Sequence, residues 1–272
     1  METDLRNKTV LITGASGGIG SEIVRWFDKE NTKLVLVYHK GREKIEALEK
    51  ELSSSFIAVQ CDLTKEVDVC NLFESAEKEY GRIDILVFCS GSLSEPKSIV
   101  NRSLDEWNRC FALNSTGAFL AAREYFKNLR KYPGEYASAV FIGSTAGAIG
   151  EAYYQDYAST KSAISLGLVK SLRVEIRDFA VKGRVNAVDP GWCATPMVRD
   201  ILNDSQRVHG ITATIPMRKV ARPADVASAV LFLASERLSG HMTGEILTVS
   251  GGMQGRLLHG ELKPISEALK PF

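Results

Sequence analysis

Two ionisable side chains, Tyr157 and Lys161, stand four positions apart in the sequence. If this segment is helical, the phenol and the ammonium lie on one face, about 6 Å apart along the helix axis. A nearby positive charge favours phenolate over phenol and draws the tyrosine pKa down from about 10, toward a working pH at which protons can be exchanged. The spacing therefore predicts that Tyr157 is a general acid and base, although the same pair is also typical of a solvated helix face.

A predicted strand delivers a serine hydroxyl to the same region. Ala139 to Gly143 is an apolar run that ends at Ser144. Such a run is typical of a strand buried on both faces, and in open α/β sheets ligands bind beyond the carboxyl ends of the strands. We therefore expect Ser144 to face the ligand that Tyr157 acts on.

Glycines follow the first predicted strand, residues 8–13, and precede a helix that runs to about residue 30. The turn between them reads Gly14-Ala15-Ser16-Gly17-Gly18-Ile19-Gly20. Glycines let the backbone approach a ligand closely, and the free N–H groups at a helix start suit a pyrophosphate. Such glycines also occur in ordinary tight turns, but a strand, a turn and a helix in this order favour a dinucleotide site.

The end of the second predicted strand, residues 33–38, bears on the choice of dinucleotide. Folds that select NAD place a carboxylate there to bond the adenosine ribose hydroxyls. Here the sequence continues Tyr38-His39-Lys40-Gly41-Arg42, with no carboxylate and three side chains that can carry positive charge. We expect NADP(H) to be favoured over NAD(H), with Tyr38, His39 and Lys40 at the cofactor. The alternative is that Lys40 and Arg42 only solvate the next helix, residues 43–52.

Strands and helices alternate along the rest of the chain. Further strands are predicted at residues 56–60, 83–89, 139–143, 183–188 and 245–250, and helices at 65–80, 104–130, 153–179 and 223–234. This alternation predicts an α/β fold: a Rossmann-type doubly wound parallel sheet of about seven strands with helices on both faces. We expect residues 1–272 to form a single domain. Asp62, directly after the third strand, is expected to accept a hydrogen bond from an adenine amino group.

Three segments depart from this regular pattern. Asn114 to Gly117 puts polar and glycine residues inside the helix predicted at 104–130, which is locally costly and indicates either a functional role or close packing at Gly117. Residues 192–216 show no clean period, and an irregular stretch of this length is usually functional, so we predict a substrate loop there. The tail at about residues 254–272 fits no predicted element.

Composition limits the partners. With 44% hydrophobic and 25% charged residues among 272, the chain can bury the core of one large domain. A net charge of +1 provides no global field for nucleic acid or an anionic membrane, so neither is expected as a partner. The five cysteines have no metal-binding spacing and the amino terminus has no apolar signal core, which predicts reduced thiols, no metal and a cytoplasmic protein.

Several motifs occur together in a fixed order: the turn Thr13 to Gly20, Asn114, Ser144, the Tyr157-xxx-Lys161 pair and Pro190-Gly191. In order and spacing they resemble the short-chain dehydrogenase/reductase family, and the likeness spans about residues 8–253. The resemblance implies an NAD(P)(H)-dependent oxidoreductase. It also implies a homodimer or homotetramer, with the helices at 104–130 and 153–179 packing across subunits.

The same resemblance implies a role for each matched residue. Tyr157 would be the general acid in reduction and the base in oxidation, and Lys161 would lower its pKa and bond the nicotinamide ribose. Ser144 would bond the substrate oxygen, and Asn114 would hold a water that relays protons to Lys161. The other matched residues would contact the cofactor: Gly14, Ser16, Gly18, Ile19, Gly20, Asp62, Leu63, Ser90, Gly91, Ile142, Pro190, Gly191 and Thr195.

One motif departs from the family pattern. After the fourth strand, where the family has Asn-Asn-Ala-Gly, this sequence reads Phe88-Cys89-Ser90-Gly91. The family uses those asparagines partly to brace the central sheet, so the brace here must be different. Gly91 and the small Ser90 still leave room for the adenosine ribose.

These observations predict hydride transfer between a nicotinamide and a ketone or secondary alcohol, and favour NADPH-dependent carbonyl reduction with Tyr157 as acid and base. A 3-oxoacyl-thioester reductase and a sugar dehydrogenase are alternatives, and the apolar content of residues 192–216 favours a hydrophobic or mixed ketone over a sugar. An NADP-binding regulatory protein on the same fold is the alternative outside enzymes, but a pure binder need not keep Asn114, Ser144, Tyr157 and Lys161 together. A nucleotide-dependent methyltransferase would not explain the Tyr157 and Lys161 pair.

Overall fold

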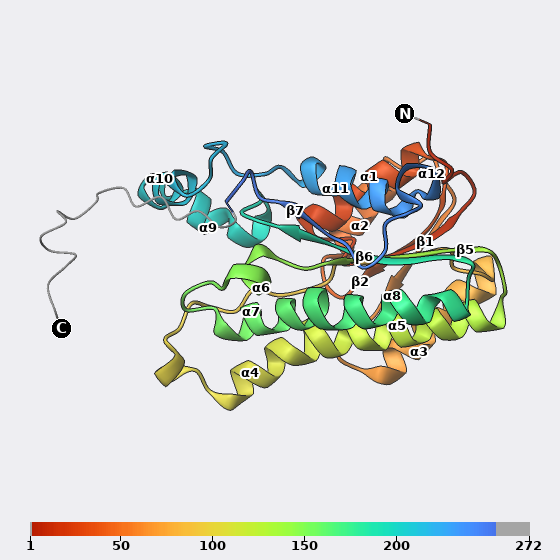
Figure 1. Cartoon of the computed structure of the whole chain (residues 1–272), viewed down its shortest axis with the longest axis horizontal. Helices are drawn as coiled ribbons and strands as arrows, with labels where there is room; N and C mark the ends of the chain where they lie inside the picture. Colours follow the sequence, from red (N-terminus) through yellow and green to blue (C-terminus); the bar gives the residue numbers. More distant parts are fainter. Residues whose placement is uncertain (1, 254–272) are drawn as a thin grey trace, which may run out of the picture.

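Seven parallel strands form a single sheet in the order β3-β2-β1-β4-β5-β6-β7. This is seen in a computed structural model that describes residues 2–253 (Figure 1). The strands are β1 (Thr9–Thr13), β2 (Lys33–Tyr38), β3 (Phe56–Gln60), β4 (Ile85–Phe88), β5 (Tyr136–Ile142), β6 (Lys182–Pro190) and β7 (Ile246–Val249). The doubly wound sheet predicted from the sequence is confirmed, and its order reverses between β1 and β4.

The sheet is covered on both faces because its strands are apolar on both faces. In β1, Val10 and Ile12 pack into one hydrophobic cluster and Leu11 packs into the other. Residues of α1 (Gly18–Lys29), α2 (Arg42–Glu49) and α11 (Pro223–Ala234) complete the first cluster. Residues of α3 (Glu66–Tyr80), α5 (Gly117–Lys131) and α8 (Val169–Glu175) complete the second. Figure 1 shows the two sets of helices on opposite sides of the sheet.

The two long helices of the second face are each interrupted by a π-helical segment. The first runs through α4 (Leu104–Phe111), η2 (Ala112–Thr116) and α5, and Asn114 lies in its π-helical part. The second runs through α7 (Gln155–Ser162), η3 (Ala163–Leu168), α8 and the short 3₁₀ turn η4 (Ile176–Asp178). A π-helical turn costs regular hydrogen bonding and frequently marks a functional position. The helix predicted at 104–130 is therefore present, and its costly residues coincide with a change of helix type.

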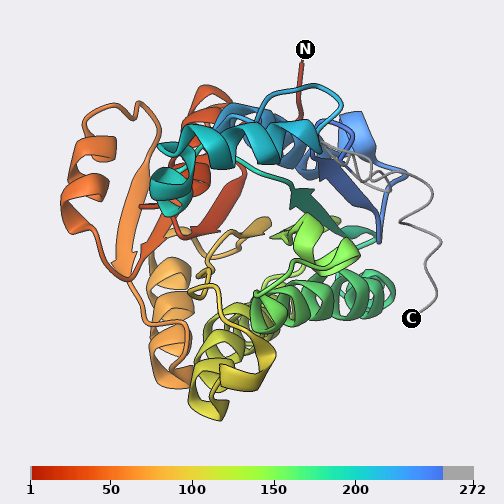
Figure 2. The same cartoon turned by 90° about the vertical axis from the view of Figure 1, so that its left-hand side faces the viewer.

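The segment predicted to be irregular, residues 192–216, is mostly helical. It contains η5 (Pro196–Val198), α9 (Arg199–Leu202) and α10 (Ser205–Ala213). Asp204 caps α10, because its carboxylate accepts hydrogen bonds from the N–H groups of Gln206 and Arg207. Figure 2 looks at this end of the molecule, with the teal α9 and α10 on one side and the green and yellow helices on the other.

A threonine hydroxyl braces the turn that departs from the family pattern. Thr13 ends β1 and is fully buried, and its Oγ1 accepts hydrogen bonds from the N–H groups of Cys89 and Ser90, each at 3.0 Å. These two groups follow directly after β4, the neighbour of β1 in the sheet. Thr13 therefore ties together the two strands at which the strand order reverses.

The remaining short elements are η1 (Ile99–Asn101), α6 (Thr145–Ile149) and α12 (Glu236–Ser239). Within residues 2–253, no helix is both long enough and apolar enough to cross a membrane. The predicted tail at 254–272 lies outside the described residues.

Candidate active site

A cavity of about 820 Å³ opens at the carboxyl ends of the central strands. In an open α/β sheet this is where ligands bind, at the point where the strand order reverses. Most residues predicted to bind substrate or cofactor line it: Gly14, Ser16, Gly18, Ile19, Gly20, Tyr38, His39, Lys40, Leu63, Ser90, Gly91, Ile142, Ser144, Tyr157, Lys161, Pro190, Gly191 and Thr195. The fold thus gathers side chains from six separate turns around one cavity.

The predicted helical spacing of Tyr157 and Lys161 is confirmed by α7. The Lys161 Nζ lies 5.8 Å from the centre of the Tyr157 ring and donates a hydrogen bond to the Ile142 carbonyl at 2.8 Å. Ser144 begins α6, and its Oγ accepts a hydrogen bond from the Ala146 N–H at 3.1 Å. Because that bond uses only a lone pair, the Ser144 hydroxyl hydrogen can still be donated to a ligand.

Burial determines the proton affinities of this pair. It raises the pKa of the Tyr157 phenol to about 12, although the adjacent Ser144 hydroxyl lowers it. It also lowers the pKa of Lys161 to about 8, and the neighbouring Cys89 and Asp189 oppose that change. The expectation that Lys161 draws the tyrosine pKa below its usual value is therefore wrong for this geometry, because desolvation of the phenolate is the largest influence on that pKa. Tyr157 is held as a protonated phenol, the form that can give a proton.

Asn114 lies behind the cavity wall and is not one of its lining residues. Its Oδ1 accepts the Ser92 N–H at 2.9 Å, and its Nδ2 donates to the Ser92 carbonyl and to Thr160 Oγ1, each at 3.1 Å. A Cβ on Gly91 would lie 3.2 Å from Lys161 Nζ and 3.3 Å from Asn114 Oδ1, so both side chains approach the same glycine. Asn114 thus fixes the backbone beside Lys161.

Asp62 also lies outside the lining, although its neighbours Cys61 and Leu63 are part of it. The Asp62 carboxylate accepts hydrogen bonds from the Thr64 hydroxyl at 2.7 Å and from the Thr64 N–H at 3.1 Å. The Thr64 hydroxyl is the main reason that the pKa of Asp62 is lowered. The carboxylate predicted to bond adenine is engaged by its own turn.

The glycine-rich turn has the shape that a dinucleotide requires. Gly14 has a φ of +70°, and a Cβ on Gly20 would lie 2.1 Å from the Gly14 carbonyl oxygen, so neither position accepts a side chain. Gly17 caps α1 without any side-chain hydrogen bond, which leaves the first N–H groups of this helix without a side-chain acceptor. A helix N-terminus of this kind attracts a pyrophosphate. The turn therefore fits the phosphates of a dinucleotide.

The cationic side chains after β2 fall into two groups. His39 and Lys40 line the cavity, as does Lys44 in the first turn of α2, with Glu43 beside it. Arg42 instead pairs with Glu46 at 3.0 Å and Glu49 at 3.7 Å, and donates a hydrogen bond to the Tyr38 hydroxyl. The view that Arg42 belongs to the surface of the next helix is thus supported, whereas Lys40 faces the cavity.

The lining residues that were not predicted from the sequence include Lys44, Leu93, Glu151 and Tyr154. Lys44 lies four residues after Lys40, and Tyr154 lies three residues before Tyr157, so both are close in sequence to predicted residues. Leu93 and Glu151 lie in loops whose course depends on the tertiary fold. Burial raises the pKa of Glu151. Among the described residues, no cluster of metal-ligating side chains is found.

Known proteins match the chain over nearly its whole length. A family model described as enoyl-(acyl carrier protein) reductase matches residues 14–254. A 3beta-hydroxysteroid dehydrogenase 1 from Eggerthella lenta is 34% identical, with 93% of this chain and 96% of the relative covered. A 3-oxoacyl-[acyl-carrier-protein] reductase from Rickettsia bellii is also 34% identical, with 92% and 98% covered. Glucose 1-dehydrogenase 2 from Bacillus subtilis is 30% identical, with 93% and 97% covered.

Solved structures have the same architecture. A short-chain dehydrogenase/reductase from Brucella melitensis, described as a glucose/ribitol dehydrogenase, superposes with a TM-score of 0.85 at 28% identity, covering 94% of this chain and all of that one. Ligand-free aldohexose dehydrogenase from Thermoplasma acidophilum gives a TM-score of 0.81 at 31% identity, with 96% and 99% covered. These proteins are named for substrates as different as steroids, acyl thioesters and sugars, so they share a reaction type and not a substrate.

Proposed function

The chain belongs to the short-chain dehydrogenase/reductase family of NAD(P)-dependent oxidoreductases, and on this premise we propose that it reduces a ketone with NADPH, with Tyr157 as the proton donor. The observation that carries the proposal is the meeting of Tyr157, Ser144 and Lys161 on the cavity that also contains the glycine-rich turn. A phenol, a hydroxyl and an ammonium are the groups needed to bind and protonate a carbonyl oxygen.

The chain's own residues divide the work of the reaction. A nicotinamide bound in the cavity supplies the hydride. The Ser144 hydroxyl donates a hydrogen bond to the substrate carbonyl oxygen, and the Tyr157 phenol transfers its proton to that oxygen. Lys161 lies beside the ring, where its positive charge stabilises the phenolate that remains. In the direction of alcohol oxidation the same phenolate accepts the proton.

The preference for NADPH rests on Lys40 and Lys44. Both line the part of the cavity next to β2, which ends in Tyr38 and has no carboxylate there to bond ribose hydroxyls. A 2′-phosphate placed there gains two ammonium partners. Glu43 lines the same part of the cavity, so the gain in affinity depends on the balance of these charges.

The substrate we propose is a hydrophobic or mixed ketone. Leu93, Trp192 and Met197 give the lining apolar surface, and Ser92 and Tyr154 add a few polar groups. The alternatives are a 3-oxoacyl thioester and a sugar, the substrates after which several relatives are named. The carboxyl of Glu151 on the lining disfavours a negatively charged substrate.

We also propose that the protein works in the cytoplasm as a homodimer or homotetramer. All five cysteines are free thiols, which suits a reducing compartment. The helical surface of α5 and η3 leaves Phe119 and Leu166 about half exposed, as expected of side chains that a second subunit covers.

The deciding experiment follows NADPH and NADH consumption with a panel of aliphatic ketones, a β-ketoester, an acyl thioester and an aldose, using the parent and the Tyr157→Phe variant. We expect NADPH-dependent turnover that falls about 10²- to 10⁴-fold in the variant, because the proton donor is lost. The cofactor dissociation constant should change little. Tight cofactor binding without turnover on any member would favour the regulatory alternative, and turnover retained by the variant would rule out Tyr157 as the proton donor.

A further inference from the structure

A buried ion pair lies directly beside the residue that we assign as the proton donor. Asp156 precedes Tyr157 in α7 and is fully buried, and Arg102, whose side chain is 3% exposed, approaches it with Nη1 at 3.5 Å from Oδ2. Arg102 comes from the other wall of the site, at the end of the segment that connects β4 to α4. Neither residue belongs to the family motifs that the sequence contains.

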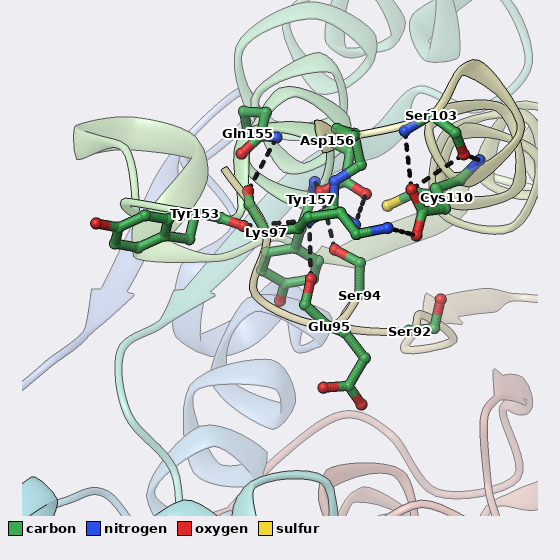
Figure 3. A network of polar contacts seen from close by, with 12 residues as sticks. Ser92, Ser94, Glu95, Lys97, Ser103, Cys110, Tyr153, Gln155, Asp156 and Tyr157 are labelled. Carbon is green, nitrogen blue, oxygen red and sulfur yellow. Dashed lines mark hydrogen bonds and ion pairs between the residues drawn. The ribbon is translucent and has the colours of Figure 1, made fainter. Parts of the chain in front are cut away.

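The other oxygen of Asp156 links the same two segments. Its Oδ1 accepts a hydrogen bond from the Ser94 hydroxyl at 2.8 Å and another from the Tyr157 N–H at 2.9 Å. Figure 3 shows Asp156 beside Tyr157 and above Ser94, with Lys97 and Gln155 close by. One carboxylate therefore holds both the connecting segment and the backbone of the tyrosine.

The turn before α7 is held from the same side. Tyr153 has a φ of +69°, a conformation that costs free energy for a residue other than glycine. Its side chain is 62% exposed, so packing does not maintain the conformation. Instead its carbonyl accepts hydrogen bonds from the Lys97 N–H at 3.0 Å and from Arg102 Nη2 at 3.2 Å. We call Ser94, Arg102, Asp156 and the Tyr153 carbonyl the Asp156 clamp.

The clamp joins two walls of the cavity. Ser92 and Leu93 line the cavity from the connecting segment, two residues or fewer before Ser94. Tyr154 and Tyr157 line it from the turn and helix on the other side. The clamp therefore connects the backbone of Tyr157 with the opposite wall of the cavity.

The ion pair is poorly suited to a purely stabilising role. Among the described residues, Arg102 Nε and Asp156 Oδ2 are buried and have no hydrogen-bond partner. A buried pair with incomplete hydrogen bonding recovers little of its desolvation cost, so a hydrophobic pair could serve stability as well. Unlike a hydrophobic pair, this ion pair fixes the position of its two side chains relative to each other.

We propose that Asp156 and Arg102 are positioning residues, which set the Tyr157 phenol against the substrate wall through the clamp. This inference rests on the proposed function, because the position of Tyr157 matters only if it transfers a proton. Small displacements of a reacting group are costly: a misplacement of about 1 Å lowers a rate about 10²-fold.

The kinetic test compares Asp156→Ala and Asp156→Asn with the parent. Asparagine keeps an oxygen that accepts from Ser94 and Tyr157, but it turns an NH2 group toward Arg102 in place of Oδ2. Its kcat should therefore fall less than that of alanine, which should lower kcat about 10²-fold. Neither variant should change the cofactor dissociation constant more than about twofold, since Asp156 does not line the cavity. A merely structural role would instead lower kcat only in proportion to the folded fraction.

Glu236→Gln is the matched control. Glu236 pairs at 2.9 Å with Arg184, an arginine as buried as Arg102, but the pair lies on α12 and β6 away from the cavity. We expect this variant to lower the melting temperature and to leave kcat unchanged below the transition. If it lowered kcat as much as Asp156→Ala, the effect of the clamp would be general destabilisation and the proposal would be wrong.

Hydrogen–deuterium exchange separates failure of the clamp from failure of the proposed function. In Asp156→Ala we expect faster amide exchange in residues 92–102 and 153–158, and unchanged exchange in α11, whether or not a substrate has been found. Faster exchange there with parental kcat would show a tether without a positioning role. Unchanged exchange in these residues would show that Asp156 does not hold the two segments together, so the clamp would be refuted. If the parent protein reduced no substrate, the proposed reductase function would be refuted. The exchange result would still be valid.

Discussion

The protonation states of Tyr157 and Lys161 set how the rate depends on pH. With a pKa of about 12 the phenol stays protonated over the whole working range, so it remains able to give a proton. With a pKa of about 8 the ammonium of Lys161 is charged below pH 8 and neutral above it. In the direction of reduction we therefore expect kcat/KM to be level at neutral pH and to fall as pH rises through about 8.

The measurement is kcat/KM for ketone reduction between about pH 6 and 10, because this ratio reports groups of the free enzyme. Lys161→Met should lower kcat/KM at neutral pH and remove the alkaline fall. A profile that is level to pH 10 in the parent would show that the Lys161 charge does not control the reaction. A fall that persists in Lys161→Met would assign it to a group other than Lys161.

Lys40 and Lys44 provide a test of cofactor choice at the level of single side chains. Replacing both with alanine should raise the NADPH dissociation constant about 10- to 100-fold, the worth of one to two charge-assisted hydrogen bonds, and should change NADH binding little. Fluorescence titration with each cofactor measures the two constants. Arg42→Ala is the control from the same turn, since Arg42 is engaged by Glu46 and Glu49. An equal effect of the control on NADPH would contradict the assignment to the two lysines.

The rules of residue spacing and charge predicted which residues form the site better than they predicted the pKa values of those residues. The i, i+4 spacing of Tyr157 and Lys161 correctly brought them onto one helix face, because helix geometry follows from sequence position. The direction of the tyrosine pKa was wrong, because desolvation depends on everything packed around the ring. Glu151 and Leu93 were missed for the same reason, since only the tertiary fold brings their loops to the cavity.

For helices and strands, the predicted bounds were right where burial imposes a periodic pattern of apolar residues. The predicted strand 33–38 and helix 223–234 have the bounds of β2 and α11, because one is buried on both faces and the other starts at a proline. The prediction failed in residues 192–216, where α9 and α10 contain no buried residue and so show no apolar stripe. The π-helical turns left only an indirect trace, the polar and glycine residues around Asn114.

The brace between β1 and β4 gives a prediction at this scale. Thr13→Val keeps the shape of the side chain but leaves the N–H groups of Cys89 and Ser90 without their acceptor. Because such groups are costly when unsatisfied, we expect a loss of about 1–3 kcal/mol in the free energy of unfolding. Urea denaturation measures the loss. Thr9→Val in the same strand is the control, since among the described residues no hydrogen bond from the Thr9 hydroxyl is found, and an equal loss there would assign the effect to the substitution itself.

For the whole molecule, the order of the strands explains why distant segments form one site. Because the strand order reverses between β1 and β4, the connections that follow these two strands leave in opposite directions. This leaves room at the carboxyl ends of the strands. Residues of the glycine-rich turn, the β4 end and α7 meet there, although they lie far apart along the chain. The same topology puts α5 and α8 side by side on the outer surface, away from the cavity.

That outer surface carries the prediction about assembly. A second cavity of about 310 Å³ lies between α5 and α8, lined mostly by apolar and aromatic side chains such as Phe119, Phe126 and Leu172. Phe119 is 49% exposed, so Phe119→Glu should leave the fold intact but bring a charge into any interface formed there. We expect light scattering to give a dimer or tetramer for the parent and a smaller species for the variant. Val181→Glu, at a valine that is 67% exposed just before the amino end of β6, is the control and should keep the parental mass. A monomeric parent, or a variant with unchanged mass, would show that this surface does not join subunits.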